Sequence, residues 1–248
     1  MTKNYEDVLR IAQELNFQAV EMDCDEKPIP ATKAGRIKMK ETFRMYGLQI
    51  FYHSPFLDQA IGSANEAIRQ NTFNTLKMYL DFLEELGAGY LVIHAGVSDA
   101  ECPEGNVVED LTKLIGIAET KSITLCTENL RLGLSSDPHR LRELAEKTGS
   151  KIAFDLGHAN SCHWTTDEKR SSKDFLRIIE DKVVAAHIYL KEEGGRHHPI
   201  KEINEVKETL DHLIGINSIV WWTMELPLLE DLIKQKLLID TFLKKRPL

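Results

Sequence analysis

The chain has 248 residues, 42% of them hydrophobic and 28% charged, which is ordinary for one globular domain spanning residues 1–248. It has no apolar run of the roughly 18 residues that a membrane span needs and no signal-peptide pattern, so we expect a cytoplasmic protein with no membrane partner. The net charge of −8 gives no global basic surface for nucleic acid, and the four cysteines show no Cys-x-x-Cys spacing.

Amphipathic helical patterns recur along the whole chain. Residues 4–15 carry an apolar stripe at three- and four-residue spacing, which predicts a helix at the start. Several later patterns stop at a glycine, as helices commonly do. These further helices are expected at about 34–46, 63–86, 107–119, 138–148, 173–180, 201–213 and 228–244.

Seven short apolar runs alternate with these helices, and each finishes in a carboxylate or a histidine. The runs are 17–21, 50–53, 91–94, 124–128, 152–155, 183–187 and 220–225. Their final residues are Glu21, His53, His94, Glu128, Asp155, His187 and Glu225. A (β/α)8 TIM barrel gathers functional side chains at the carboxyl ends of its strands in this way. We therefore expect an α/β protein with this fold.

The element count leaves one strand out. There are eight helical patterns for seven strands, and only three residues precede the first helix. We expect a barrel lacking or truncated in its first β-strand. We interpret the gap as an incomplete N-terminus, because two unpaired sheet edges are costly and prone to aggregation.

Four of the strand-end residues form a set with a clear chemical use. Glu128, Asp155, His187 and Glu225 come from four strands and offer three carboxylates and one imidazole, a donor set for Mn²⁺, Zn²⁺, Co²⁺ or Mg²⁺. The lack of thiolates favours a catalytic metal site over a structural one. No Gly-x-Gly-x-x-Gly or Walker-type loop follows a strand, so no nucleotide cofactor is expected.

Three more histidines belong to the same predicted rim. His53 and His94 end their strands, and His158 lies three residues after Asp155. Each could be a buried structural histidine with a hydrogen-bond partner. Their shared position favours a further metal ion or hydrogen bonds to a substrate instead.

Several motifs together resemble the xylose isomerase-like barrel superfamily. They are His-Ser-Pro-Phe at 53–56, Ser-Ala-Asn-Glu at 63–66, Gly-Ala-Gly-Tyr-Leu-Val-Ile-His-Ala-Gly at 87–96, Glu-Asn at 128–129, Asp-Leu-Gly-His at 155–158 and Glu-Leu at 225–226. The resemblance covers about residues 4–244. This superfamily contains sugar isomerases and epimerases and the endonuclease IV type of AP endonuclease, so the resemblance implies a barrel and a dependence on divalent metal.

The sugar-epimerase pattern implies one metal ion held by the four-residue set. Glu128 and Glu225 would also act as the acid/base pair that removes and returns a carbon proton through an enediolate. His158 and Arg196 would bind substrate oxygens. The further residues expected beside a sugar or sugar phosphate are His197 and His198, which share a basic patch with Arg196, and Trp164.

The endonuclease pattern implies three zinc ions. His53, His94 and Glu128 would hold one, the four-residue set a second, and His158 with a later Asp-x-His pair a third. This chain departs at the last element, because Gly195, or Arg196 in a shifted match, stands where the aspartate is expected. The third ion would then lack its carboxylate.

The sequence therefore ranks three functions. A metal-dependent isomerase or epimerase acting on a small sugar or sugar phosphate comes first. A zinc-dependent AP endonuclease is the alternative, because the loops after His53 and His94 carry no Lys or Arg and phosphate contacts dominate DNA affinity. Nucleic acid is accordingly not the expected partner, and we predict no efficient incision of abasic-site DNA. A degenerate barrel without activity ranks last, and a homo-oligomer is compatible with the sequence.

Overall fold

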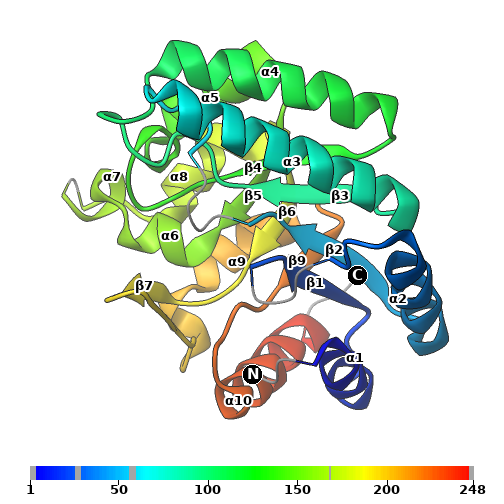
Figure 1. The fold of residues 1–248 in the computed structure, drawn as a ribbon. Helices are drawn as coiled ribbons and strands as arrows, with labels where there is room; N and C mark the ends of the chain where they lie inside the picture. Colours follow the sequence, from blue (N-terminus) through cyan, green and yellow to red (C-terminus); the bar gives the residue numbers. More distant parts are fainter. Residues whose placement is uncertain (1–3, 26–28, 56–59, 168, 246–248) are drawn as a thin grey trace.

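A computed structural model describes residues 4–25, 29–55, 60–167 and 169–245 of the chain. Within these ranges, seven parallel strands form the main sheet (Figure 1). They are β1 (Ala19–Asp23), β2 (Gln49–His53), β3 (Tyr90–Ile93), β4 (Thr124–Glu128), β5 (Lys151–Asp155), β6 (Val183–His187) and β9 (Trp221–Thr223). Two further strands, β7 (Lys191–Glu193) and β8 (Arg196–His198), pair with each other as an antiparallel hairpin.

Helices precede or follow each strand and surround the sheet (Figure 1). The long ones are α1 (Tyr5–Glu14), α2 (Lys33–Tyr46), α3 (Glu66–Leu86), α4 (Glu104–Thr120), α5 (Pro138–Thr148), α8 (Ser172–Ile179), α9 (Lys207–Ile214) and α10 (Leu229–Lys244). The short ones are α6 (Leu156–Ser161), α7 (His163–Thr166) and the 3₁₀ turns η1 (Leu134–Ser136), η2 (Glu180–Lys182) and η3 (Ile203–Glu205). No helix in the described ranges is long and apolar enough to cross a bilayer.

The strand order is β1-β2-β3-β4-β5-β6-β9, which is a barrel short of one strand. β1 and β9 lie next to each other, but no backbone ladder joins these two edges in the part of the chain that the structure describes. The predicted TIM barrel is therefore confirmed, and in the described residues no strand precedes α1. Residues 1–3, which precede α1, lie outside the described ranges.

Six side chains, each from a different strand, fill the barrel interior below the strand ends. They are Phe51, Val92, Cys126, Ala153, Ala185 and Trp221. The rings of Phe51 and Trp221 stack with their centroids 4.0 Å apart. Because strand side chains alternate between faces, the residue two positions further along each strand also points inward. In five of the six cases that residue is one of the polar residues predicted at the strand ends. They are His53, His94, Glu128, Asp155 and His187.

Predicted and observed strand boundaries differ most at the ends of the first and last strands. The first strand runs to Asp23 rather than ending at Glu21, so Glu21 lies within β1. The last strand ends at Thr223, two residues before Glu225. Local apolar runs mark the buried part of a strand, and they do not report where the backbone ladder ends.

Candidate metal centre

The four-residue set converges at the carboxyl ends of its strands. His187 Nδ1 lies 2.9 Å from Glu128 Oε1, 3.7 Å from Asp155 Oδ2 and 3.5 Å from Glu225 Oε1. One ligand atom from each of the four lies within 4.8 Å of every other. The side chains of Glu128, Asp155 and His187 are at most 1% exposed, whereas Glu225 is 26% exposed and faces the opening.

This group fits a divalent cation. Among the described residues, no donor makes a hydrogen bond to the buried Asp155 Oδ2. A buried carboxylate oxygen without a donor is costly unless a cation accepts its charge. Three carboxylates and one imidazole are ligands that Mn²⁺, Co²⁺, Zn²⁺ and Mg²⁺ accept in catalytic sites.

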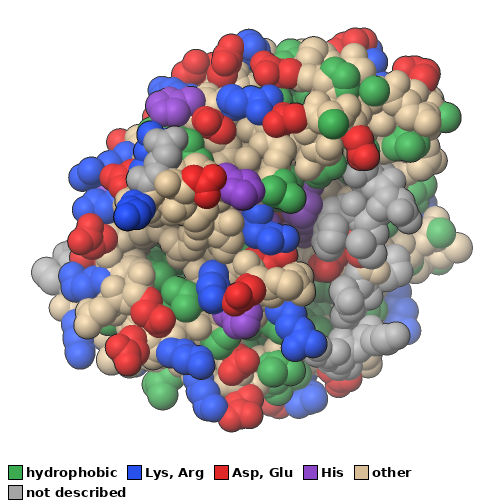
Figure 2. Space-filling model, turned by 90° about the vertical axis from the view of Figure 1, so that its left-hand side faces the viewer, with side chains coloured by type: hydrophobic (Ala, Val, Ile, Leu, Met, Phe, Trp, Pro, Cys, Tyr) green, Lys and Arg blue, Asp and Glu red, His purple; other side chains and the backbone are tan. Residues whose placement is uncertain are grey.

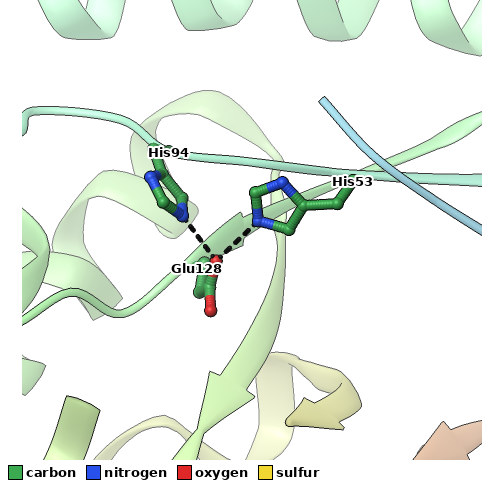
Figure 3. Close-up of side chains that lie close together, drawn as sticks. All are labelled: His53, His94 and Glu128. Atoms are coloured by element: carbon green, nitrogen blue, oxygen red, sulfur yellow. Dashed lines mark hydrogen bonds and ion pairs between the residues drawn. The ribbon is translucent and has the colours of Figure 1, made fainter. Parts of the chain in front are cut away.

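A second group shares Glu128 with the first (Figure 3). His94 Nε2 lies 2.8 Å from Glu128 Oε2, and His53 Nε2 lies 3.0 Å from the same oxygen. The two rings come from neighbouring strands and converge on this carboxylate from one side. Glu128 therefore directs Oε2 to the second group and Oε1 to the first.

A third group forms beside them from His158, Glu192 and His197. His158 Nε2 lies 3.0 Å from Glu192 Oε2, and Glu192 pairs with His197 across the β7–β8 ladder. A carboxylate therefore lies beside His158 and His197, although the chain lacks the Asp-x-His pair that the sequence analysis looked for. This carboxylate belongs to Glu192 on the opposite strand of the hairpin and not to the position two residues before His197.

Backbone carbonyls orient three of these histidines. The Nδ1 atoms of His53, His158 and His197 lie 2.9, 2.9 and 3.0 Å from the carbonyl oxygens of Ser54, Asn129 and Glu225. A carbonyl only accepts, so each Nδ1 carries a proton, and loss of the Nε2 proton when an ion arrives leaves the Nε2 lone pair as the ligand. This is the tautomer that a metal-binding histidine needs, fixed before any ligand arrives.

Asn129 ties two of the strand ends together. Its side-chain oxygen accepts a 2.8 Å hydrogen bond from Asp155 N, and its amide nitrogen donates a 2.8 Å bond to Asp155 O. Asp155 Oδ1 in turn caps α6 by accepting from His158 N at 2.6 Å. These bonds hold Asp155 and His158 in fixed positions relative to β4.

Opposing effects shift the pKa of the shared carboxylate. Burial alone would raise the pKa of Glu128, but the charge and hydrogen bond of His187, together with hydrogen bonds from His53 and His94, hold it well below its usual range. The pKa of Glu225 is raised, first by burial and then by the negative charge of Glu128, against the attraction of His187.

The histidines respond to the same carboxylates. Burial would lower the pKa of His53, but the hydrogen bond and charge of Glu128 raise it to about 9. Burial likewise opposes charging of His158, and Asp155 and Glu192 raise its pKa to about 10. In the metal-free centre His53 and His158 are thus protonated between carboxylates, whereas burial lowers the pKa of His94.

The remaining residues proposed from the sequence lie on the hairpin and on α7. Arg196 and His198 are on β8, where His198 Nε2 lies 4.0 Å from Glu193 Oε2. Trp164 packs edge-on against Phe175, with the Arg170 guanidinium 4.3 Å above its ring. These contacts are packing contacts, and the role of Trp164 as a substrate wall stays a prediction.

Figure 2 shows the face that carries α6, α7 and β7, where the strands end. Histidine side chains are recessed in a hollow there, with Lys and Arg as well as Asp and Glu side chains around it. Arg131 belongs to this region, because its Nη2 lies 2.9 Å from Glu192 Oε1. An arginine therefore lies directly beside the carboxylate of the third group.

Sequence reasoning missed Tyr189 as part of the centre. Its ring stacks on His197 with centroids 4.0 Å apart and planes 10° apart. The lack of a side chain at Gly157 makes room for it, since a Cβ there would lie 2.0 Å from Tyr189 Cε2. The glycine in Asp-Leu-Gly-His is the sequence signal for this close approach.

Sequence and structure comparisons agree with this architecture. The sequence model of the xylose isomerase-like TIM barrel family matches residues 9–244. An uncharacterized protein of Methanocaldococcus jannaschii is 32% identical over 168 residues, which are 67% of this chain and 68% of that protein.

Two solved structures share the fold. A D-tagatose 3-epimerase-like protein is 24% identical with a TM-score of 0.75, covering 93% of this chain and 90% of that one. Endonuclease IV from Thermus thermophilus is 17% identical with a TM-score of 0.74, covering 99% and 96%. With the match over residues 9–244, the chain belongs to the xylose isomerase-like TIM barrel family.

Proposed function

We propose that the protein is a multinuclear metal-dependent hydrolase of phosphate esters, with abasic-site DNA as its substrate class. The observation that carries the proposal is the third group, in which Glu192 completes a set with His158 and His197. It reverses the ranking made from the sequence, because the expected lack of that carboxylate was one reason for placing hydrolysis second, beside the lack of Lys and Arg in the loops after His53 and His94. The endonuclease IV neighbour shares the fold and supports the choice of substrate.

The residue arrangement suits a phosphate centred between the groups. The three groups lie beside one another, because Glu128 belongs to two of them and His158 of the third group has its Nδ1 3.7 Å from Glu128 Oε1. When bound, several divalent ions polarise a phosphoryl group and supply a nucleophile at neutral pH. Each protein group would hold its ion from a buried, pre-oriented position, so little reorganisation is needed during the reaction.

Cationic side chains beside the third group supply a contact for phosphate. Arg131 lies against Glu192, and Arg196 and Lys191 are exposed on the hairpin. An arginine fork matches phosphate oxygens in pairs, which positions a diester without reading base sequence. Because the overall charge of the chain is −8, a DNA backbone would dock on this local cationic patch.

The test is incision of a duplex that carries one abasic site. The purified chain is stripped with a chelator, reloaded with Zn²⁺ or Mn²⁺, and its ions per chain are counted by mass spectrometry. Three ions and metal-dependent incision at the abasic site, with an undamaged duplex left intact, are the expected results. A fully loaded chain that cuts neither abasic DNA nor a simple phosphodiester would overturn the proposal.

A specific observation favours a metal-dependent epimerase as the second candidate. Glu128 and Glu225 both approach His187 Nδ1, so two carboxylates of one metal group could flank a sugar carbon. One could remove its proton and the other return it. Entry of solvent deuterium next to the carbonyl of a ketose, with one ion per chain sufficient for full activity, would promote this candidate.

A further inference from the structure

Glu21 is a buried carboxylate that reaches the metal centre from the other side of His187. Its side chain is 2% exposed, and its Oε1 lies 3.1 Å from His187 Nε2. Its other oxygen accepts two hydrogen bonds from β9, from Trp221 Nε1 and Thr223 Oγ1, both at 2.9 Å. Among the described residues, the groups that could hold a metal ion do not include Glu21.

The two oxygens of Glu21 have different partners. Oε2 is saturated by the donors on β9 and is held in place by them. Oε1 makes no hydrogen bond within the described residues and faces His187 Nε2, which makes none either. The 3.1 Å contact is therefore an ion pair whose N–H direction is not yet aligned with the oxygen.

His187 differs from the other histidines of the centre in its orientation. His53, His158 and His197 present Nε2 and anchor Nδ1 on a backbone carbonyl. His187 presents Nδ1 to Glu128, so its proton must reside on Nε2 when Nδ1 binds a metal ion. That buried N–H then needs an acceptor, and Glu21 Oε1 faces it.

We propose that Glu21 is the positioning residue of the four-residue metal group, holding His187 in the tautomer that leaves Nδ1 free for the ion. The inference rests on the metal centre of the proposed function and adds a residue to it. A carboxylate behind a metal-bound histidine fixes the ring and raises its basicity as a ligand. The anchor on Trp221 and Thr223 means that this support depends on the two open edges of the barrel staying together.

A purely structural role for Glu21 predicts something different. Its bonds to β9 bridge the edges β1 and β9, where no backbone ladder was found in the described residues. If bridging were its whole role, removing the carboxylate would lower thermal stability and leave the affinity of the folded protein for metal unchanged. Metal affinity and thermal stability are therefore measured separately.

The experiment compares stepwise Zn²⁺ affinities by chelator competition in the full-length chain. The step assigned to the four-residue group is the one that disappears in Asp155→Ala. Glu21→Ala should weaken that step by about 10–100-fold, the usual cost of losing such a partner. Thr223→Val is the matched control, because it removes one bond to Oε2 and leaves Oε1 facing His187; it should weaken the step far less.

Glu21→Gln is the second variant, and it keeps the inference testable if Glu21→Ala does not fold. An amide has only one accepting oxygen. That oxygen can accept from Trp221 and Thr223 on β9 or from His187 Nε2, and the other donors lose their acceptor. When the oxygen meets β9, the amide NH₂ faces Nε2 and favours the wrong tautomer of His187. The Zn²⁺ step should weaken in this variant also.

Nuclear magnetic resonance of ¹⁵N-histidine gives a readout independent of affinity and activity. In the Zn²⁺-loaded parent, His187 should show a slowly exchanging Nε2–H signal, and the signal should be lost in both Glu21 variants. A signal and an affinity that are unchanged in folded Glu21 variants would overturn the inference alone. A parent with no Zn²⁺ step dependent on Asp155 would overturn the proposed function and this inference with it.

Discussion

Glu192 lies opposite His197 across the two-residue turn of the β7–β8 hairpin. Gly194 and Gly195 form that turn, both with positive φ, which suits the tight turns that join antiparallel strands. Glu192→Gln should therefore lower the number of Zn²⁺ ions from three per chain to two, because an amide binds Zn²⁺ far more weakly than a carboxylate. Metal counting after gel filtration checks this.

The control for that variant is the next residue. Glu193 is exposed and pairs with Lys191 at 2.7 Å rather than with the centre. Glu193→Gln should retain three ions per chain. Equal metal content in the two variants would remove Glu192 from the third group.

Gly157→Ala should damage the third group without touching any of its ligands. The added Cβ would lie 2.0 Å from the Tyr189 ring, which has His197 stacked on it. The ring must move toward His197, and overpacking of this kind costs about 1–3 kcal/mol. Gly116→Ala is the control, since a Cβ there meets nothing within 4 Å and favours its helix. Thermal melting and metal content should fall only in the Gly157 variant.

The double variant His53→Ala/His94→Ala should lose one ion and keep the fold. Both rings contact Glu128 Oε2, and Glu128 Oε1 keeps its contact with His187. The four-residue group therefore remains complete. A Zn²⁺ titration with the same number of binding steps as the parent would show that these histidines serve as hydrogen-bond partners instead.

Glu225→Gln should abolish turnover while the melting temperature of the metal-free chain changes little. Glutamine has almost the volume of glutamate but lacks its charge and basicity. Glu225 is 26% exposed toward the mouth, so its amide can be solvated. Circular dichroism verifies the fold, and incision and deuterium-exchange assays both report the loss of activity. Retained turnover in either assay would contradict a catalytic role.

Metal binding should release protons at neutral pH. The pKa of His53 is about 9 and that of His158 about 10 in the metal-free fold, so both carry a proton that an ion must displace. Affinity should therefore rise with pH up to that range. Calorimetry in two buffers with different protonation enthalpies counts the released protons, and a value of zero would contradict the prediction.

The same shifts predict the stability of the metal-free chain. Both pKa values are raised above the unfolded value of about 6.5, so protonation favours the folded state. This contribution is present in full below about pH 6.5 and is lost as the pH rises through about 9 to 10. Melting of the chelator-treated protein across this range should show the decline.

The barrel and the four-residue group could be predicted because they depend on local patterns. A strand is read from an apolar run, and parallel strands bring their ends to the same mouth. The grouping of His187 with Glu128, Asp155 and Glu225 follows from these two facts alone. The same reasoning placed His53 and His94 beside Glu128, where the structure has them.

Glu21 and Glu192 depend on relationships that a linear pattern does not carry. The apolar run 17–21 predicts Glu21 only as a strand end, whereas its proposed role comes from facing His187 from within β1. The endonuclease pattern does not point to Glu192, because it expects an aspartate two residues before a histidine. The Gly194-Gly195 pair is a hairpin signal that could have predicted its pairing with His197.

Glu128 belongs to two ligand groups at once, with one oxygen directed to each. Two ions held by the two groups would therefore share one carboxylate charge, and their affinities are coupled through it. Such coupling is reciprocal, so each ion changes the affinity for the other by the same factor. A substitution that alters only the His53 and His94 side of the carboxylate is then expected to change the affinity on the His187 side as well.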